Sequence, residues 1–426
     1  MFIVAFIIFS VLLLLGVPIA FAMGLGSVLA IFTSGLNINP VLVAHKLFSG
    51  VDSFSMMAIP FFMLSGELME RGGISKRIVD LAHSLVGHIT GGLGMVDILT
   101  SVIFAGISGS AAADTAACGS MLIGPMKKRG YPSGLAAVIQ ACAGSLGPII
   151  PPSLTMIIYC SLTNTSIGEV FMAGIIPGLL IGLSLMFVTY FYARKYKIRS
   201  EHRATLKEIG TALRASVLAL VMPLIIVGGI VGGVFTATEA GAVACVYAFI
   251  VGFFVYRNFT LKDIPQIICK AAGMTGMSLL IVATAAVFSW LVAYVKLPQT
   301  IVVFLTSITK SKIIIMMLLV LFLLIVGMFI ETISATIIVA PILFPVMAQY
   351  GINPIQFALV MVIILVYAGV TPPVGGVLYI TMGIAEVKMK DVLGFLGPYL
   401  IAVLAVILLT IMIPELSTFI PNLIWH

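Results

Sequence analysis

Charged side chains are scarce in this 426-residue chain: Asp, Glu, Lys and Arg make up 9% of it, against about 25% in soluble domains. Hydrophobic residues make up 61%, and the mean hydropathy is +1.25. Uncharged stretches of about 20 residues recur along nearly the whole length, as in membrane-spanning helices. The weakly alternating segments of a transmembrane barrel are not seen. The sequence therefore predicts an all-α polytopic membrane protein and excludes a soluble one.

Cysteine and histidine are also scarce, and motifs for catalysis or nucleotide binding are incomplete or missing. "GISG" at Gly106–Gly109 fits a serine-protease motif, but no histidine lies within a later crossing to act as its base. No Walker A pattern occurs, which excludes ATP hydrolysis by this chain. We therefore expect a protein that is not an enzyme. Five cysteines without paired spacing are expected to be small core residues, and not disulfides or metal ligands: Cys118, Cys142, Cys160, Cys245 and Cys269.

Basic residues are missing from the start of the chain. No Lys or Arg precedes Lys46, so the first segment lacks the basic region of a signal peptide and is expected to be retained. The net charge of +7 is expected to reflect basic loops beside the membrane, with no role in nucleic-acid binding.

Two double prolines interrupt the apolar runs, although a proline inside a helix costs about 3 kcal/mol. Pro151–Pro152 lies in "GPIIPPS" and Pro372–Pro373 in "GVTPPVG", 221 positions later. The same offset relates Gly130 to Gly351. A fixed offset with weak identity predicts two structural repeats. We place the repeats at 1–192 and 216–426, joined by a basic linker at 193–215.

The loops of the two repeats have opposite charge. "KKR" at 127–129 corresponds to the uncharged residues 348–350, and "KMK" at 388–390 corresponds to 167–169, which has no basic residue. Because basic loops stay in the cytoplasm, we expect repeats of inverted topology, a cytoplasmic linker and two periplasmic termini. This topology leaves four basic residues outside: Lys46, Lys296, Lys310 and Lys312.

The hydropathy pattern predicts about ten crossings and two re-entrant hairpins. The hairpins are expected near 93–126 and 311–347. Segments 74–90 and 297–309 are expected either to lie along the interface as bracing helices or to pack as ordinary helices of the bundle. The crossings are expected near 2–16, 18–33, 53–70, 131–163 (a broken helix), 171–192, 216–235, 238–256, 274–295, 353–386 (a second broken helix) and 396–413.

Each repeat contributes a hairpin tip and a helix break. The tips are "GISGSAAADT" (106–115) and "GMFIETISAT" (327–336). Unwound backbone at membrane depth is tolerated where it is buried in protein or lines a cavity. Its carbonyls can then coordinate Na⁺, and half-helix N-termini favour an anion; the alternative is that the prolines only kink structural helices. Hydroxyl ligands expected there are Ser108, Ser110, Thr332, Ser334 and Thr371.

Four acidic residues lie deep in apolar sequence: Asp97, Asp114, Glu239 and Glu331. Intramembrane carboxylates are costly and usually face the protein interior. Asp114 and Glu331 follow the two hairpin tips, where they could coordinate a cation, orient groups toward a substrate, carry a proton, or only cap and pack a helix. Glu239 follows Thr236 and Thr238 and is expected to belong to an N-terminal cap.

Four motifs, "GISGSAAADTAACGSMLIGPMKKRGY", "GPIIPPS", "GVFTATEAGAV" and "GVTPPVG", together resemble the large membrane subunit of tripartite ATP-independent periplasmic (TRAP) transporters. The resemblance covers essentially the whole chain. It implies Na⁺-driven import of an organic anion by an elevator mechanism, in which two hairpins and two broken helices slide against a scaffold. It also implies a bacterial inner membrane and two protein partners, a small four-helix membrane subunit and a periplasmic substrate-binding protein.

The resemblance further implies the site residues, with two or more Na⁺ ions. One Na⁺ site would use backbone carbonyls of Ser108, Ser110, Gly147, Ile150 and Pro152. The corresponding Na⁺ site of the second repeat would use Glu331, Thr332, Gly369, Thr371 and Pro373. The substrate would lie between them near Ser110, Thr155 and Glu331, with Asp114 as a further candidate from the residue pattern. Many relatives have Asp in place of Glu331.

The substrate class is only partly defined by the sequence. No buried arginine is available to pair with a carboxylate, so hydroxyls, backbone N–H groups and helix ends are expected to bind it. The overall pattern favours sialic acid, with C4-dicarboxylates as the alternative. A partner-independent divalent-anion/Na⁺ symporter of similar hairpin architecture is the second hypothesis. A channel is disfavoured because paired hairpins at the midplane suit alternating access.

Inverted topology can be tested by labelling of single cysteines in a background that lacks the native ones. A cysteine near Arg203 should react only with reagent on the cytoplasmic side, because the linker is rich in basic residues. A cysteine near Tyr350 should react only from outside. Labelling of both from one side would contradict the inverted arrangement.

Overall fold

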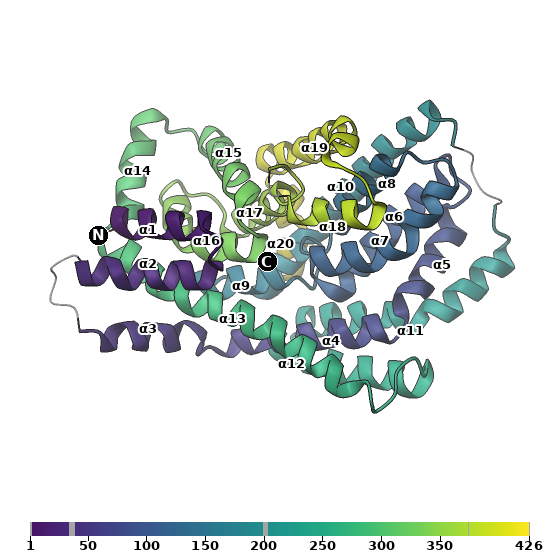
Figure 1. The fold of residues 1–426 in the computed structure, drawn as a ribbon, viewed down its shortest axis with the longest axis horizontal. Coiled ribbons are helices and arrows are strands. Elements are labelled where there is room, and N and C mark those ends of the chain that lie inside the picture. Colours follow the sequence, from purple (N-terminus) through teal and green to yellow (C-terminus); the bar gives the residue numbers. More distant parts are fainter. Residues whose placement is uncertain (1, 34–38, 199–202, 374, 426) are drawn as a thin grey trace.

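The computed structural model describes residues 2–33, 39–198, 203–373 and 375–425, and every regular element in these ranges is a helix (Figure 1). Within them, seven helices are long and apolar enough to cross a membrane, or eight if a bent pair counts as one span. The prediction of an all-helical polytopic protein is confirmed at this level. The number of ten crossings and the re-entrant course of the hairpins stay predictions.

The helices follow one another in the same order in the two halves of the chain. The first half contains α1 (Phe2–Leu14), α2 (Ile19–Thr33), α3 (Val41–Val51), α4 (Ala58–Arg71), α5 (Ile74–Val86), α6 (Gly92–Ser108), α7 (Ala111–Lys128), α8 (Ser133–Gly144), α9 (Leu154–Thr163) and α10 (Ile167–Lys195). The second contains α11 (Leu206–Val231), α12 (Ala237–Phe249), α13 (Ile264–Tyr294), α14 (Leu297–Ile308), α15 (Lys312–Phe329), α16 (Thr332–Gln349), α17 (Pro354–Ala368), α18 (Gly376–Ala385), α19 (Met389–Met412) and α20 (Glu415–Trp425).

The offset of 221 relates the helices as well as the prolines. Adding it to the bounds of α7 gives those of α16, and α5 to α9 correspond to α14 to α18 within three residues at each end. α6 and α7 pack as one hairpin, and α15 and α16 as the other. α8 and α9 are the two parts of the first broken helix, and α17 and α18 those of the second. The relative inversion of the halves stays a prediction.

Several helices differ from the sequence-based expectations. α3 was not expected. The chain bends by 60° between α3 and α4, whereas their counterpart in the second half, α13, is one continuous helix. α20 was also not expected. Helix covers much of the predicted linker, because α10 runs on to Lys195 and a reciprocal Thr205–Glu208 cap starts α11 at Leu206. Predicted features that lie outside the described residues are 199–202 of this linker, His202, His426 and Val374 of the second break.

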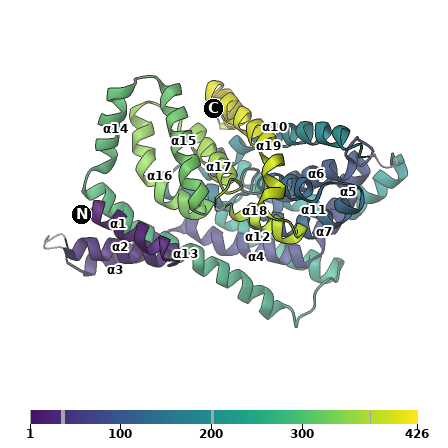
Figure 2. The ribbon, with the colours of Figure 1, turned by 45° about the horizontal axis from the view of Figure 1, so that its top comes forward.

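Three of the four parts of the broken helices lie near the centre of the molecule: α9, α17 and α18 in Figure 1, and α17 and α18 again in Figure 2. Every residue of α17 from Ile355 to Ala368 is buried, and so is every residue of α8 from Gly134 to Gly144. Both are apolar all round, as expected of helices enclosed by others. α18 packs against α7 and α8, and α16 packs against α9, so elements of both halves interleave. α4 and α13 pack together along one side, where α4 meets α6 and α13 meets α16.

Two local predictions can be compared with the structure. The expected cap at Glu239 is confirmed, because its carboxylate accepts from the backbone N of Thr236 while the Thr236 hydroxyl accepts from the N of Glu239. All five cysteines are free, and Cys118, Cys142 and Cys160 are buried as expected. Cys269 is exposed on α13, so the expectation of a core residue is wrong there. The residue lies on a face of α13 that this chain does not cover.

A buried tyrosine fixes the first hairpin to the first broken helix. The Tyr131 hydroxyl, just before α8, donates to the Gly91 carbonyl at 2.8 Å and accepts from the Gly94 N–H at 3.0 Å. The residue is 4% exposed. The Gly94 N–H therefore depends on this side chain, whereas the Gly91 carbonyl also accepts from the Met95 N–H at 3.0 Å.

Replacing this tyrosine with phenylalanine should lower the melting temperature in detergent. Tyr131→Phe leaves the buried Gly94 N–H without its partner, at a cost of about 1–3 kcal/mol, whereas the Gly91 carbonyl still accepts from the Met95 N–H. Tyr294→Phe is the control, because Tyr294 is exposed. Equal melting temperatures for the two variants would show that the Tyr131 hydroxyl does not hold the hairpin.

Candidate functional site

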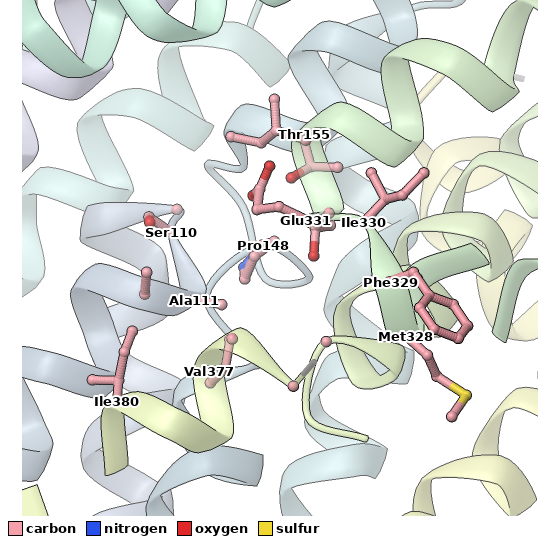
Figure 3. Close-up of a pocket in the computed structure, with 18 residues that line it drawn as sticks. Ser110, Ala111, Pro148, Thr155, Met328, Phe329, Ile330, Glu331, Val377 and Ile380 are labelled. Atoms are coloured by element: carbon pink, nitrogen blue, oxygen red, sulfur yellow. The ribbon is translucent and has the colours of Figure 1, made fainter. Parts of the chain in front are cut away.

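A cavity of about 300 Å³ lies where both hairpin tips meet both helix breaks (Figure 3). Glu331 and Thr155 lie near each other on one side of it, and Ser110 lies on the other side. The remaining lining is mostly apolar or backbone. The cavity is lined by Gly109–Ala112 of the first tip, Pro148 and Thr155 of the first break, Gly327–Ile333 of the second tip, and Gly369, Gly375–Val377 and Ile380 of the second break.

The first tip turns at Gly109 and touches the first break. Gly109 has a φ of +64°, in the left-handed region that glycine adopts at little cost. A Cβ there would collide with the Pro152 carbonyl and lie 3.3 Å from the Cα of Ser153. Ser110 then begins α7, with its hydroxyl accepting from the Ala113 N–H at 3.5 Å. A tight turn and a missing side chain together let the tip lie directly on the break.

The first break is held open by its own hydrogen bonds. The Ser153 hydroxyl donates to the Pro148 carbonyl at 2.6 Å and accepts from the Met156 N–H at 3.2 Å, which caps α9. A serine thus replaces part of the hydrogen bonding that the prolines remove. The Pro151–Pro152 bond and its counterpart Pro372–Pro373 are both cis.

Asp114 lies behind this break with one oxygen unpaired. The residue is fully buried. The Ser108 hydroxyl donates to its Oδ1, whereas its Oδ2 has no hydrogen-bond partner. A Cβ built on Gly147 would collide with Oδ2 and lie 3.1 Å from the Ser110 carbonyl oxygen. Because a buried carboxylate oxygen without a partner is costly, Oδ2 of Asp114 and the nearby Ser110 carbonyl are oxygens that suit a small cation such as Na⁺.

The second tip brings a carboxylate into the cavity. Glu331 is exposed to the cavity and caps α16, accepting from the Ser334 N–H at 3.2 Å and from its hydroxyl at 3.4 Å. The adjacent Thr332 hydroxyl donates to the Leu365 carbonyl at 3.5 Å, near the end of α17. The Gly369 carbonyl accepts from the Val377 N–H at 3.3 Å across the second break. These oxygens already have partners, unlike Oδ2 of Asp114.

The predicted site residues divide into those at the cavity and those behind it. Ser110, Thr155, Glu331, Thr332 and Gly369 line the cavity. Ser108, Gly147, Pro152 and the substrate candidate Asp114 lie together behind the first tip.

Three other predicted ligands are not among the residues that line the cavity. The Ile150 side chain packs against Gly178 of α10, and its backbone carbonyl stays a predicted ligand. The Thr371 hydroxyl donates to the Tyr367 carbonyl at 3.0 Å, and the Pro373 carbonyl accepts from the Tyr379 hydroxyl at 3.3 Å. Neither Thr371 nor Pro373 is among the residues that line the cavity.

Four helix N-termini converge on the cavity; the sequence predicted half-helix N-termini there, and the structure shows which helices supply them. The first turns of α7, α9, α16 and α18 all contribute lining residues. Ser110, Ser153 and Glu331 cap the first three, whereas α18 begins at Gly376 without a side-chain cap. Helix N-termini carry free N–H groups and a partial positive charge, which together favour an anion. Among the residues that the structure describes, no arginine or lysine lines the cavity.

Paired hairpins over broken helices define a membrane-transport fold. The structure is similar to that of the YdaH transporter of Alcanivorax borkumensis, with a TM-score of 0.63 and 16% identity over 86% of each chain. It is also similar to MtrF of Neisseria gonorrhoeae, with a TM-score of 0.60 and 14% identity over 91% of this chain and 85% of that one. At such identities the likeness concerns the fold alone.

The family is defined by sequence. The model described as "Tripartite ATP-independent periplasmic transporter, DctM component" matches residues 6–416. The C4-dicarboxylate TRAP transporter large permease protein DctM of Rhodobacter capsulatus is 36% identical over 99% of both chains. The 2,3-diketo-L-gulonate counterpart YiaN of Escherichia coli K12 is 38% identical over 94% of both, and the sialic acid counterpart SiaM of Vibrio cholerae is 36% identical over 97% of this chain and 96% of that one.

The chain therefore belongs to the DctM family of TRAP transporter large permease proteins. It is a multi-pass membrane protein of a family of transporter subunits and not of enzymes, as expected from the sequence.

Glu331 is both a helix cap and a cavity residue, and two substitutions separate these roles. Glu331→Gln keeps an oxygen that can accept from Ser334, so the protein should fold and melt nearly as before. Transport should fall at least about tenfold, because a hydrogen bond to a charged group contributes about 1.5–3 kcal/mol. Glu331→Asp should retain measurable transport.

The control is Glu415→Gln, at an exposed position on α20. Uptake is measured in proteoliposomes and melting temperature in detergent. Normal uptake by a well-folded Glu331→Gln protein would remove this residue from the site.

Proposed function

We propose that this chain is the permease subunit of a secondary transporter that imports an organic anion, coupled to Na⁺. The observation that carries the proposal is the convergence of four helix N-termini on one cavity between two hairpin tips. Such a cavity attracts negative charge without a basic side chain. A substrate held by backbone groups can also be released without breaking a strong ion pair.

The substrate is an organic acid. The relatives are named for C4-dicarboxylates, 2,3-diketo-L-gulonate and sialic acid, and all three carry a carboxylate. A cavity of about 300 Å³ is at the small end of the range for ligand sites. The Glu331 carboxylate repels a second negative charge unless a cation or hydroxyl lies between them. Sialic acid, which has one carboxylate and many hydroxyls, fits this arrangement better than a C4-dicarboxylate.

Na⁺ is the coupling ion in this proposal. The space bounded by Ser110, Asp114 and Gly147 offers a backbone carbonyl and an unpartnered carboxylate oxygen, and unwound backbone of this kind coordinates Na⁺ in other transporters. Bound Na⁺ supplies positive charge beside the anion cavity. Thr332 and Gly369 are the corresponding candidates for a second Na⁺ ion, because each offers an oxygen that can bind a hard cation.

The transporter works with two further proteins. A small membrane subunit and a periplasmic substrate-binding protein are expected from membership of the family, in a bacterial inner membrane with periplasmic termini. α6 to α9 and α15 to α18 are the elements that would move as one transport domain against α4 and α13. The partner-independent Na⁺ symporter is the competing hypothesis.

Uptake by proteoliposomes containing the large and small subunits tests the proposal. Labelled organic acid should accumulate only with the binding protein outside, and uptake should rise steeply with external Na⁺, with a Hill coefficient above 1. Gly147→Ala should abolish the Na⁺ dependence, because the new methyl group occupies the space between Asp114 and Ser110. Gly124→Ala, in the same hairpin with no atom within 4 Å of a new Cβ, is the control.

Undiminished uptake in Na⁺-free buffer under a proton gradient would reject Na⁺ coupling. Uptake without the binding protein would favour the partner-independent symporter. Equal Na⁺ dependence of uptake in the two glycine variants would show that the coupling ion does not bind beside Asp114.

A further inference from the structure

A cluster of charged side chains joins α4 to α13 outside the anion cavity. The Lys270 Nζ lies 2.7 Å from Glu67 Oε2 and 3.7 Å from Glu70 Oε2. The Arg71 Nε is 3.8 Å from Glu67 Oε1, beyond hydrogen-bonding distance. The Glu67 side chain is 3% exposed, whereas that of Lys270 is 47% exposed. A fixed buried carboxylate thus faces an ammonium group on a long, solvent-accessible chain.

This cluster is adjacent to the tip of the first hairpin. A second cavity, of about 30 Å³, is lined by Glu67 and Glu70 on one side and by Ser108, Ser110 and Ala113 on the other. Its volume is that of about one water molecule or small ion. α4 approaches the tip at Gly66, where a Cβ would lie 3.9 Å from the Cα of Ser108. Glu70 is also close enough to Asp114 to interact with it electrostatically.

One carboxylate oxygen of the cluster accepts no hydrogen bond, although Arg71 lies 3.8 Å from it. Oε1 of Glu67 is buried and has no hydrogen-bond partner, although Glu67 lines the small cavity. A buried carboxylate is stable only when its lone pairs are satisfied. Ser108 belongs both to this cavity and to the hydrogen bond with Asp114. Ser108 at the hairpin tip therefore connects the small cavity to Asp114, and Ser110 lines both this cavity and the anion cavity.

The positions of basic residues indicate that the cluster lies toward the cytoplasmic side of the membrane. Arg71 and Lys270 lie at the ends of α4 and α13 that carry basic residues, together with Lys262. Basic residues mark the cytoplasmic ends of membrane helices. An ion that moves from Asp114 to Glu67 and Glu70 therefore moves toward the cytoplasm.

We propose that Glu67 and Glu70 form a release site for the transported cation, which Lys270 occupies when the cation is absent. The proposal rests on the Na⁺ coupling proposed above. The ion leaves the Ser110–Asp114 space, is held briefly by the two carboxylates, and is displaced by the Lys270 ammonium group. Because Lys270 is tethered beside the site, it competes with Na⁺ at a high local concentration. At any given cytoplasmic Na⁺ concentration, Lys270 therefore lowers the fraction of release sites that Na⁺ occupies.

Counting bound ions tests the role of Lys270. Purified wild-type protein and Lys270→Gln are equilibrated with ²²Na⁺ at constant ionic strength, with Lys262→Gln as a control that removes an exposed charge of the same sign nearby. Lys270→Gln should bind one more Na⁺ per chain than the other two proteins. The double variant Lys270→Gln/Glu70→Gln should lose this additional ion. Equal numbers in wild type and Lys270→Gln would overturn the proposal.

A second variant keeps the test valid if Lys270→Gln does not fold. Glu70→Gln leaves the 2.7 Å pair between Lys270 and Glu67 in place, and Glu70 is partly exposed, so the fold should survive. Release of ²²Na⁺ to the cytoplasmic side of proteoliposomes should slow several-fold. Unchanged release would mean that the cluster only braces α4 against α13.

Failure of this proposal can be distinguished from failure of Na⁺ coupling. If wild-type uptake is independent of Na⁺, the proposed function itself is wrong. If wild-type uptake depends on Na⁺ and neither Lys270→Gln nor Glu70→Gln changes the count or the release of ions, only the release site is rejected.

Discussion

Backbone polar groups inside a membrane must find partners within the protein, and the centre of this molecule is organised by that requirement. Two prolines in each half interrupt a buried helix, which frees carbonyl and N–H groups where no water is available. Each break is covered by a hairpin of its own half. Gly109 lies against Pro152 at the first break, and a Cβ on Gly327 would lie 3.2 Å from the Leu365 carbonyl beside the second. Both contacts require glycine, because a side chain would hold the tip away.

The same freed groups account for both kinds of binding. Helices that restart after a break or a tip present their N-termini, which attract an anion. The residues just before them present carbonyls and, at Asp114, a carboxylate oxygen without a partner, which attract a cation. In this account the anion and the cation therefore bind on the two sides of the first hairpin tip. The cluster of Glu67, Glu70 and Lys270 extends this arrangement toward the cytoplasm, with a lysine as the competing cation.

The sequence predicted the elements better than their side-chain environments. The 221-residue offset related the two breaks to each other, and the hydropathy pattern with the polar motifs at 106–115 and 327–336 located both tips. Hydropathy gave no sign of α3, because the bend at Asp52 and Ser53 divides one apolar run in two. Glu67 was overlooked because it lies near the end of a predicted crossing, where acids are usually solvated; only the packing of α13 beside it shows its burial. The absence of a side-chain cap on α18 also required the structure, since capping depends on which groups meet in space.

The central claim is that a cation occupies the space between Ser110, Asp114 and Gly147. High-resolution cryo-electron microscopy of the complex in Na⁺ and in choline, otherwise under identical conditions, tests it most directly. The account predicts density in Na⁺ that contacts the Ser110 carbonyl and Oδ2 of Asp114, and its loss in choline. Identical density in the two solutions, or a Na⁺-dependent peak that contacts neither oxygen, would contradict it.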